Sequence, residues 1–218
     1  MNKMKRITYL LIIGILFSIN GFSQNDKNAL DILNKASAAY NKAGGVKATF
    51  TAKVLNTHGV AQSVITGSIS LKGSKFKLVT ESMTTWFDGT NQWVYIKKNN
   101  EVNLSKPTEK ELLMVNPINV FELYKHGYTC KLLGDKTEGG KKVFQVELKP
   151  SDKNETVQNI TASFDKTHFH PVLLSITNKN KLVTRITINS YAIEQKFAET
   201  LFVFQQKEYP NSEVIDLR

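Results

Sequence analysis

The chain alternates apolar and polar residues over long stretches, and residues 46–55 show this most clearly. In V-K-A-T-F-T-A-K-V-L every second residue is apolar: Val46, Ala48, Phe50, Ala52 and Val54. The residues between them are lysines and threonines. Successive side chains of a strand point to opposite faces of a sheet, so this period of two predicts a strand with one buried face.

The same alternation returns along the chain, with turn signals between the segments. Further strands are predicted over residues 64–71, 75–79, 82–87, 91–97, 101–104, 128–133, 142–149, 159–164, 171–178 and 182–191. Asp88-Gly89 and Asn99-Asn100 are tight-turn signals, so the segments around them should form an antiparallel meander. Roughly ten strands, eleven by the ranges given, at a spacing of about 8–12 residues predict a single, mainly β (α+β) domain.

Two regions have helical spacing instead. Residues 26–42 should form a helix capped by Asn25 or Asp26 and ended by Gly44-Gly45, with apolar residues at Leu30, Leu33, Ala36 and Tyr40. Residues 105–127 predict two short helices, each opened by a proline. Their apolar residues are more than one narrow stripe needs, so this insertion suits a cover over a sheet face.

The N-terminus has the layout of a secretory signal peptide. Lys3, Lys5 and Arg6 precede an apolar run over residues 7–17, and small residues follow at Gly21 and Ser23. This run is shorter than the roughly 20 residues that span a bilayer. We expect cleavage after Ser23, which leaves residues 24–218 as one exported domain.

Charge and cysteine content narrow the class of protein. The exported domain carries a formal charge of +7, since residues 1–23 hold three of the cations behind the net +10 of the chain and no acids. Its lysines are scattered, without the basic block of a nucleic-acid-binding protein, so no nucleic-acid partner is expected. The single cysteine, Cys130, forms no internal disulfide and should pack as a small apolar residue.

Motifs for catalysis are absent from the sequence. It contains neither G-x-S-x-G nor H-E-x-x-H, and its acids are scattered among lysines. His168 and His170 lie two apart, but two ligands do not complete a tetrahedral metal site, so an exposed pair at a strand end is the expectation. We therefore expect no catalytic residues, no metal and no cofactor.

Aromatic residues concentrate in T-T-W-F-D-G-T-N-Q-W-V-Y-I, which holds both tryptophans, Trp86 and Trp93. Trp93 and Tyr95 should point to one face of their strand, and Val94 and Ile96 to the other. A strand that is apolar on both faces needs cover on both sides, which disfavours a sugar-stacking platform. A thick hydrophobic core and a partly filled apolar pocket both remain open.

Several segments, in order and spacing, resemble the periplasmic outer-membrane lipoprotein carriers, the LolA-like family. G-S-I-S-L-K-G-S-K-F-K-L is similar to its G-x-L-x-L-K segment, and F-D-G-T-N-Q-W-V-Y-I-K-K to its D-G-x-x-x-W-x-Y hairpin. N-P-I-N-V-F-E-L-Y is similar to its proline-led helix, and the tail F-V-F-Q-Q-K-E-Y-P-N-S-E-V-I-D to its closing element. The resemblance spans essentially the whole exported domain.

The resemblance implies an incomplete, strongly curved antiparallel β-barrel, covered by an N-terminal helix and short lid helices around an apolar cavity. It implies a monomeric periplasmic chaperone that is not an enzyme. Such a carrier takes a lipoprotein from an inner-membrane transporter, shields its acyl chains, touches membrane surfaces transiently and delivers to an outer-membrane acceptor. The cargo lipid stays open, and so does a lipid- or lipoprotein-sensing role on the same fold; an envelope hydrolase using His168 or His170 is less favoured.

Candidate residues for lining the lipid cavity combine this resemblance with the apolar pattern. They are Phe76, Leu78, Trp93, Tyr95, Ile118 and Phe121, with Leu33, Phe50 and Ile69 behind them. Structural core is the competing interpretation for each. One departure from the family concerns its lid arginine, which follows the lysine of the L-K segment; here Gly73-Ser74 follows Lys72, so lid control is expected to differ.

Overall fold

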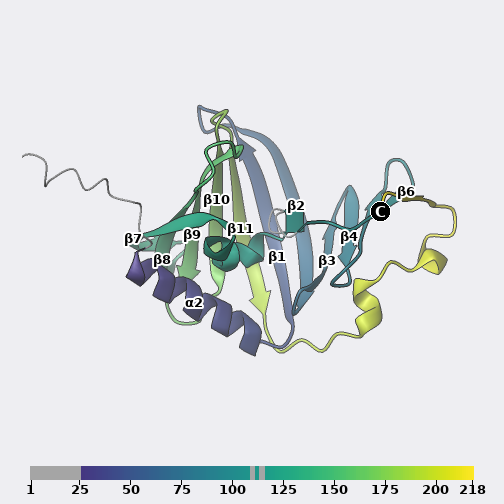
Figure 1. Cartoon of the computed structure of the whole chain (residues 1–218), viewed down its shortest axis with the longest axis horizontal. Coiled ribbons are helices and arrows are strands. Elements are labelled where there is room, and N and C mark those ends of the chain that lie inside the picture. Colours follow the sequence, from purple (N-terminus) through teal and green to yellow (C-terminus); the bar gives the residue numbers. More distant parts are fainter. Residues whose placement is uncertain (1–25, 109–110, 113–115) are drawn as a thin grey trace, which may run out of the picture.

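The protein is described by a computed structural model that covers residues 26–108, 111–112 and 116–218, with only the backbone of residues 117–119. Its main feature is one sheet of twelve strands (Figure 1). The strands are β1 (Val46–Leu55), β2 (Ala61–Lys72), β3 (Lys75–Thr80), β4 (Met83–Phe87), β5 (Gln92–Ile96), β6 (Glu101–Ser105), β7 (Tyr128–Glu138), β8 (Lys141–Pro150), β9 (Val157–Asp165), β10 (Pro171–Asn178), β11 (Val183–Ala192) and β12 (Glu213–Asp216).

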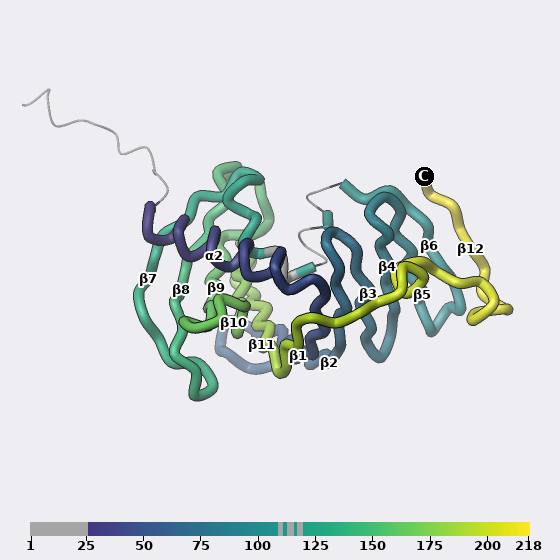
Figure 2. Tube along the Cα trace, turned by 90° about the horizontal axis from the view of Figure 1, so that it is seen from below, coloured from purple at the N-terminus to yellow at the C-terminus, as the bar shows by residue number. Residues whose placement is uncertain are grey.

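The sheet is curved and open. Its order is β12-β6-β5-β4-β3-β2-β1-β11-β10-β9-β8-β7, with every pair antiparallel except β12 and β6. Seen from below, the strands from β7 to β2 curl around one side, and β3 to β6 extend away from them (Figure 2). In the described part of the chain the two edge strands, β7 and β12, do not pair with each other, so the barrel stays open. The predicted mainly β, incomplete antiparallel barrel is confirmed, with one parallel pair added.

Strand β1 follows its sequence pattern closely. Val46 and Ala48 are buried, while Lys47 between them is exposed. We call the buried side of the sheet its inner face. Phe50 on this face lies opposite Gly67 of β2, and a Cβ at Gly67 would lie 2.6 Å from the Phe50 ring. The phenylalanine therefore packs there because its neighbour has no side chain.

Helix α2 (Lys27–Lys42) lies across the inner face and is tied to the sheet edge by its cap. The Oδ1 atom of Asp26 accepts the backbone N–H groups of Asn28 at 2.8 Å and Ala29 at 3.4 Å. Its Oδ2 atom accepts the N–H of Leu132 in β7 at 3.2 Å. One carboxylate thus caps the helix and satisfies part of an open strand edge, and these bonds, the one from Leu132 foremost, hold the pKa of Asp26 below its usual value.

The 3-10 helix η1 (Pro117–His126) completes the cover beside α2. The Ser37 hydroxyl donates to Oε1 of Glu122 at 2.6 Å, and the Tyr124 hydroxyl donates to Oδ1 of Asn34 at 2.6 Å. Beneath both helices lies a core that includes Cys130, which is 4% exposed and packs as predicted. Burial raises the pKa of its thiol.

The last part of the chain covers the opposite, outer face of the sheet. We call residues 193–218 the C-terminal arm; it contains the 3-10 helices η2 (Glu199–Phe202) and η3 (Gln206–Glu208) and ends in β12. Figure 2 shows it running along β3, β4 and β5. Lys72 and Lys75 each approach a different carboxylate oxygen of Glu199 at 2.6 Å, which fastens η2 to the β2–β3 turn.

The structure departs from the sequence prediction in three places. Strand β12 was not predicted, because its four residues gain their order from pairing with β6. Strand β7 continues to Glu138 through a bulge between Leu132 and Gly134, where the sequence predicts a longer turn. The second predicted helix is a 3-10 helix. The signal peptide, and all of the first lid helix except residues 106–108 and 111–112, lie outside the described residues.

Truncation of Phe202 tests whether the C-terminal arm is part of the folded unit. Its side chain is fully buried, so Phe202→Ala should lower the free energy of unfolding by about 3–5 kcal/mol in urea denaturation. The matched control is Leu217→Ala on the same arm, which is 62% exposed and should change it by less than about 0.5 kcal/mol. Equal, small effects would mean that the arm is not packed on the sheet.

Tyr40 connects α2 to the β2–β3 turn, which Glu199 of η2 also contacts. Its hydroxyl donates to the backbone oxygen of Gly73 at 2.6 Å, and its ring packs against Phe121 with 5.5 Å between centroids. Burial disfavours the phenolate and raises the pKa of Tyr40 to about 12.

This pKa predicts a pH dependence of stability. The unfolded chain releases the Tyr40 proton near pH 10 and the folded chain near pH 12, so the stabilisation is complete below pH 10 and is lost between these values. Tyr40→Phe should therefore flatten the decline of unfolding free energy over pH 10–12, while costing about 1 kcal/mol at pH 7 through the lost hydrogen bond. Denaturation series at several pH values measure both; an unchanged slope would contradict the assignment.

Candidate functional site

The inner face continues beyond the helices as a set of apolar side chains that are only partly covered. Strand registers place them on the same side as the core, because directly opposed residues share a face. They are Ala52, Val54, Ile65, Leu78, Met83, Val94, Ile96 and Ile176. We call these eight residues the inner apolar surface.

Exposure separates this surface from the core. Ile65 is 45% exposed and Met83 38%, whereas Ile69, on the same face of β2 as Ile65, is 1% exposed. A strand that buries its apolar side chains should stay covered along its whole length. Here the cover ends part of the way along, so apolar side chains remain in reach of a ligand.

A cavity lies on the same face, at the C-terminal end of α2. Its volume is about 600 Å³, and the residues around it include Ala36, Tyr40, Phe121, His170, Tyr191 and Ile193. Tyr191 is opposed to the core residue Ala48, which places it on the inner face. Cavities of this size and character commonly hold small apolar ligands.

Two polar groups of this cavity, Tyr191 and His170, are uncharged at neutral pH. Burial raises the pKa of Tyr191 and lowers the pKa of His170. At pH 7 the phenol therefore keeps its proton and the imidazole is neutral. With the alanines of α2 and Phe121 beside them, these walls offer apolar surface, and the cavity is also lined by Lys42 and Glu194.

Six of the nine predicted cavity-lining residues lie in or against the core. Leu33, Phe50, Ile69, Phe76 and Phe121 are at most 8% exposed, and Leu78 packs against them while also belonging to the inner apolar surface. Among the predicted residues whose side chains the structure describes, Phe121 is the one that also lines the cavity at α2. The side chain of Ile118 lies outside the described residues.

Trp93 and Tyr95 lie on the outer face, away from the other predicted residues. Trp93 is directly opposed to Trp86, and Phe87, the next residue after Trp86, points into the core. The Trp86 ring packs edge-on against Phe204 at 5.5 Å. One cavity therefore does not contain both Trp93 and Phe76.

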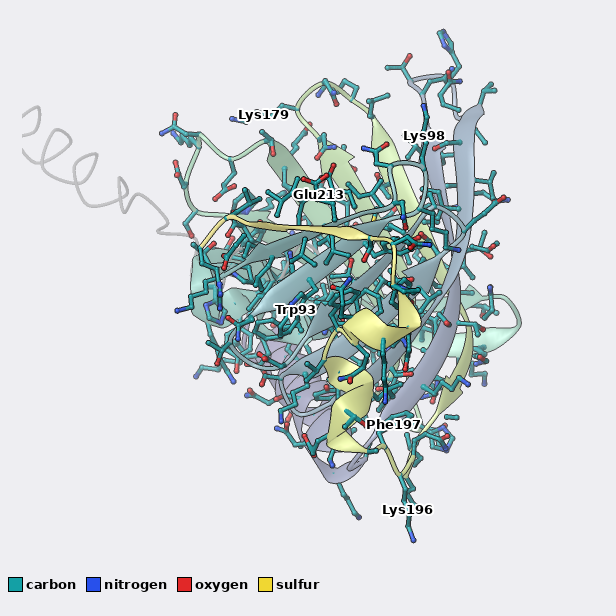
Figure 3. The ribbon with its side chains drawn as sticks, turned by 90° about the vertical axis from the view of Figure 1, so that its right-hand side faces the viewer. Trp93, Lys98, Lys179, Lys196, Phe197 and Glu213 are labelled. Atoms are coloured by element: carbon teal, nitrogen blue, oxygen red, sulfur yellow. The ribbon has the colours of Figure 1, made fainter. Side chains whose placement is uncertain are left out.

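The C-terminal arm supplies the second cover that the sequence of β5 demands. Tyr209 packs on Trp86 at 5.5 Å and on Tyr95 at 4.7 Å between ring centroids. Figure 3 shows the arm rising from Lys196 and Phe197 and crossing to Glu213, with Trp93 on the sheet between them. Trp86 and Tyr95 thus anchor the arm.

Alternation along the strands indicates which residues face inward, but not where the helices stop. Ile65 and Ile69 have the same place in the pattern of β2, yet only Ile65 is left uncovered. Met83 precedes the recognisable hairpin, and Tyr191 ends a long strand, so neither stands out in the sequence. Their shared location comes from strand pairing between distant segments.

The β2–β3 turn, where Gly73-Ser74 replaces the lid arginine expected from the family after Lys72, is held by other groups. Lys72 donates to the Phe197 backbone oxygen at 3.4 Å and pairs with Glu199. Hydrogen bonds from Lys72 and Lys75 lower the pKa of Glu199 to about 2. Arg185 is opposed to Lys53 on the outer face, so it does not reach the inner apolar surface.

One protein-family model matches most of the chain. The model described as outer membrane lipoprotein carrier protein LolA matches residues 19–180. A search of curated proteins finds no match. Among the described residues, no helix has both the length and the apolar character needed to cross a membrane.

Solved structures share the fold at low sequence identity. An uncharacterized conserved protein from Thermus thermophilus superposes with a TM-score of 0.61 and 10% identity over 87% of this chain and 99% of that chain. A DUF1329 family protein from Desulfovibrio piger has a TM-score of 0.51 and 10% identity, over 83% and 98%. The family model covers most of this sequence, and the chain belongs to the LolA family of outer membrane lipoprotein carrier proteins.

Proposed function

We propose that this protein is a carrier that shields the acyl chains of lipoproteins, or of another lipid, between the inner and outer membranes. The observation that supports this role most directly is the inner apolar surface, on which Ile65 and Met83 remain exposed beside a packed core. The carrier description of the family points the same way. The role requires no catalysis.

Energetics favour an incompletely covered surface for such cargo. Exposure of an acyl chain to water costs about 0.8 kcal/mol of free energy for each methylene, so a carrier must bury many methylenes. It must also release them, which a fully packed core would hinder. Side chains such as Leu78 and Val94 are half-buried in the protein, and a ligand would complete their burial.

Export forms part of the proposal. Residues 1–23 have the charge and apolar pattern of a cleaved signal peptide, and the domain of residues 24–218 would then act in the periplasm. A transporter in the inner membrane would deliver the cargo, and an acceptor in the outer membrane would receive it. Contact with each membrane would be transient.

Adjacent residues on β2 provide a matched test of the binding surface. Ile65 points inward and Val64 outward, opposite Lys53, and they are 45% and 56% exposed. Ile65→Asp should weaken binding of a fluorescent diacylated lipopeptide at least about tenfold. The bound acyl chains would bury the new carboxylate, and removing its hydration without a partner is costly. Equilibrium titration with the purified domain measures the dissociation constant.

Val64→Asp is the control for this titration. It places the same charge on the same strand, on the outer face, and should leave the dissociation constant within about twofold. Circular dichroism would verify that both variants fold. If both substitutions weaken binding equally, or if neither weakens it, the inner apolar surface is not the lipid-binding surface.

Depletion in the source cell distinguishes a carrier from a protein that only senses lipid. Loss of a carrier should make outer-membrane lipoproteins accumulate at the inner membrane, as measured by membrane fractionation and immunoblotting. Re-expression of the wild type should restore their distribution, and Ile65→Asp should not. A normal distribution after depletion, with lipopeptide binding intact, would contradict transport and leave a sensing role.

A further inference from the structure

The turn between β9 and β10 brings three metal-ligating residues together in the segment D-K-T-H-F-H. Asp165 ends β9, and His168 and His170 precede Pro171 at the start of β10. One ligand atom from each of the three residues lies within 4.8 Å of the others. Asp165 thus adds a third donor to the pair of histidines that lie two residues apart in the sequence.

Backbone hydrogen bonds hold this turn in shape. Oδ1 of Asp165 accepts the N–H groups of Thr167 at 2.9 Å and His168 at 2.7 Å. The backbone of Asp165 also bonds to that of Phe169 and His170, each at 2.9 Å. Phe169 adopts a positive φ of 59° while its ring stacks on Phe144 at 6.0 Å. The donors therefore sit on a fixed scaffold.

The imidazoles are also positioned by their neighbours. The ring of His170 stacks on Tyr191 with 4.8 Å between centroids, and His168 stacks on His170 at 5.8 Å. Nδ1 of His168 lies 3.2 Å from Oδ1 of Asp165. Lys166 pairs with Asp135 at 2.5 Å, so this nearby cation is directed away from the Asp165 carboxylate.

Space for further ligands lies next to these side chains. His168 and His170 both line the cavity of about 600 Å³ at the end of α2. Metal sites with three protein ligands keep an open position for water or another ligand. Two of the three donors therefore line a cavity with room for further ligands.

We propose that Asp165, His168 and His170 bind one divalent transition-metal ion, with Zn²⁺ as the first candidate, and that its remaining coordination positions face the cavity. Two imidazoles and a carboxylate suit Zn²⁺ or its first-row neighbours, whereas Mg²⁺ and Ca²⁺ prefer oxygen ligands. Ligand atoms around tetrahedral zinc lie about 3.3 Å apart, given bonds of about 2.0 Å. The donors lie within 4.8 Å of one another, so a bound ion would draw them closer, and the 70% exposed His168 side chain has room to move.

Calorimetric titration of the tag-free protein of residues 24–218 with ZnCl₂ tests this site. The wild type should bind one Zn²⁺ per chain, and His168→Ala should raise the dissociation constant by about tenfold or more. His58→Ala is the control, since His58 lies on the exposed β1–β2 turn, and it should leave the constant within about twofold. MgCl₂ should show no stoichiometric binding.

Thermal unfolding provides a second measurement that does not depend on heats of binding. Zn²⁺ at about ten times the wild-type dissociation constant should raise the melting temperature of the wild type and of His58→Ala, and should raise that of His168→Ala clearly less. No stoichiometric binding, equal loss in both variants, or unchanged binding in His168→Ala would overturn the proposal. Because the metal alone is the probe, these outcomes are separate from those that test lipid carriage.

Discussion

The pairing of β1 with β11 is the interaction on which the rest of the structure depends. It joins two runs of sequence neighbours, β2 to β6 and β10 to β7, into a single sheet. It also carries the apolar alternation of β1 across the junction, because Phe50 opposes Ile188 and Ala52 opposes Ile186. Without this non-local pair the inner face would be two separate surfaces. The continuous apolar wall therefore depends on a contact that closes a long loop.

The dimensions of the cover explain why part of the inner face stays open. Helix α2 has 16 residues and is about 24 Å long at 1.5 Å per residue. Neighbouring strands are about 4.8 Å apart, so a helix of this length crosses about five strand intervals, fewer than half of those in the sheet. Figure 2 shows α2 crossing from β7 toward β1. The inner sides of β2 to β5 extend past the helix, and most of the inner apolar surface lies there.

The fold follows from local patterns in the sequence to a large extent. The period of two in β1 and the cap at Asp26 mark elements that the structure contains. The faces of β5 were also readable as apolar on both sides. The segment that covers each face cannot be read from the local sequence, because Tyr209 and Phe204 reach Trp86 only after the chain has crossed the sheet. Resemblance and the apolar pattern therefore group Trp93 with Phe76, although the strand register places them on opposite faces of the sheet.

Candidate sites were harder to predict for the same reason. Ile65 has the same signal as Ile69, and the position of the helices decides which of them is exposed. Asp165 looks like one scattered acid until the β9–β10 turn places it beside His168. In both cases the missing information is the distance between segments, which residue type and spacing along one strand do not contain.

Photo-crosslinking tests the central claim, that acyl chains bind the inner face, most directly. A lipopeptide with a diazirine at the end of its acyl chain would be irradiated in complex with the protein, and the modified residues identified by mass spectrometry. Labels should fall on the inner apolar surface, at positions such as Leu78 and Val94. Labels concentrated on outer-face residues such as Trp93 and Tyr95, beneath the C-terminal arm, would contradict the account.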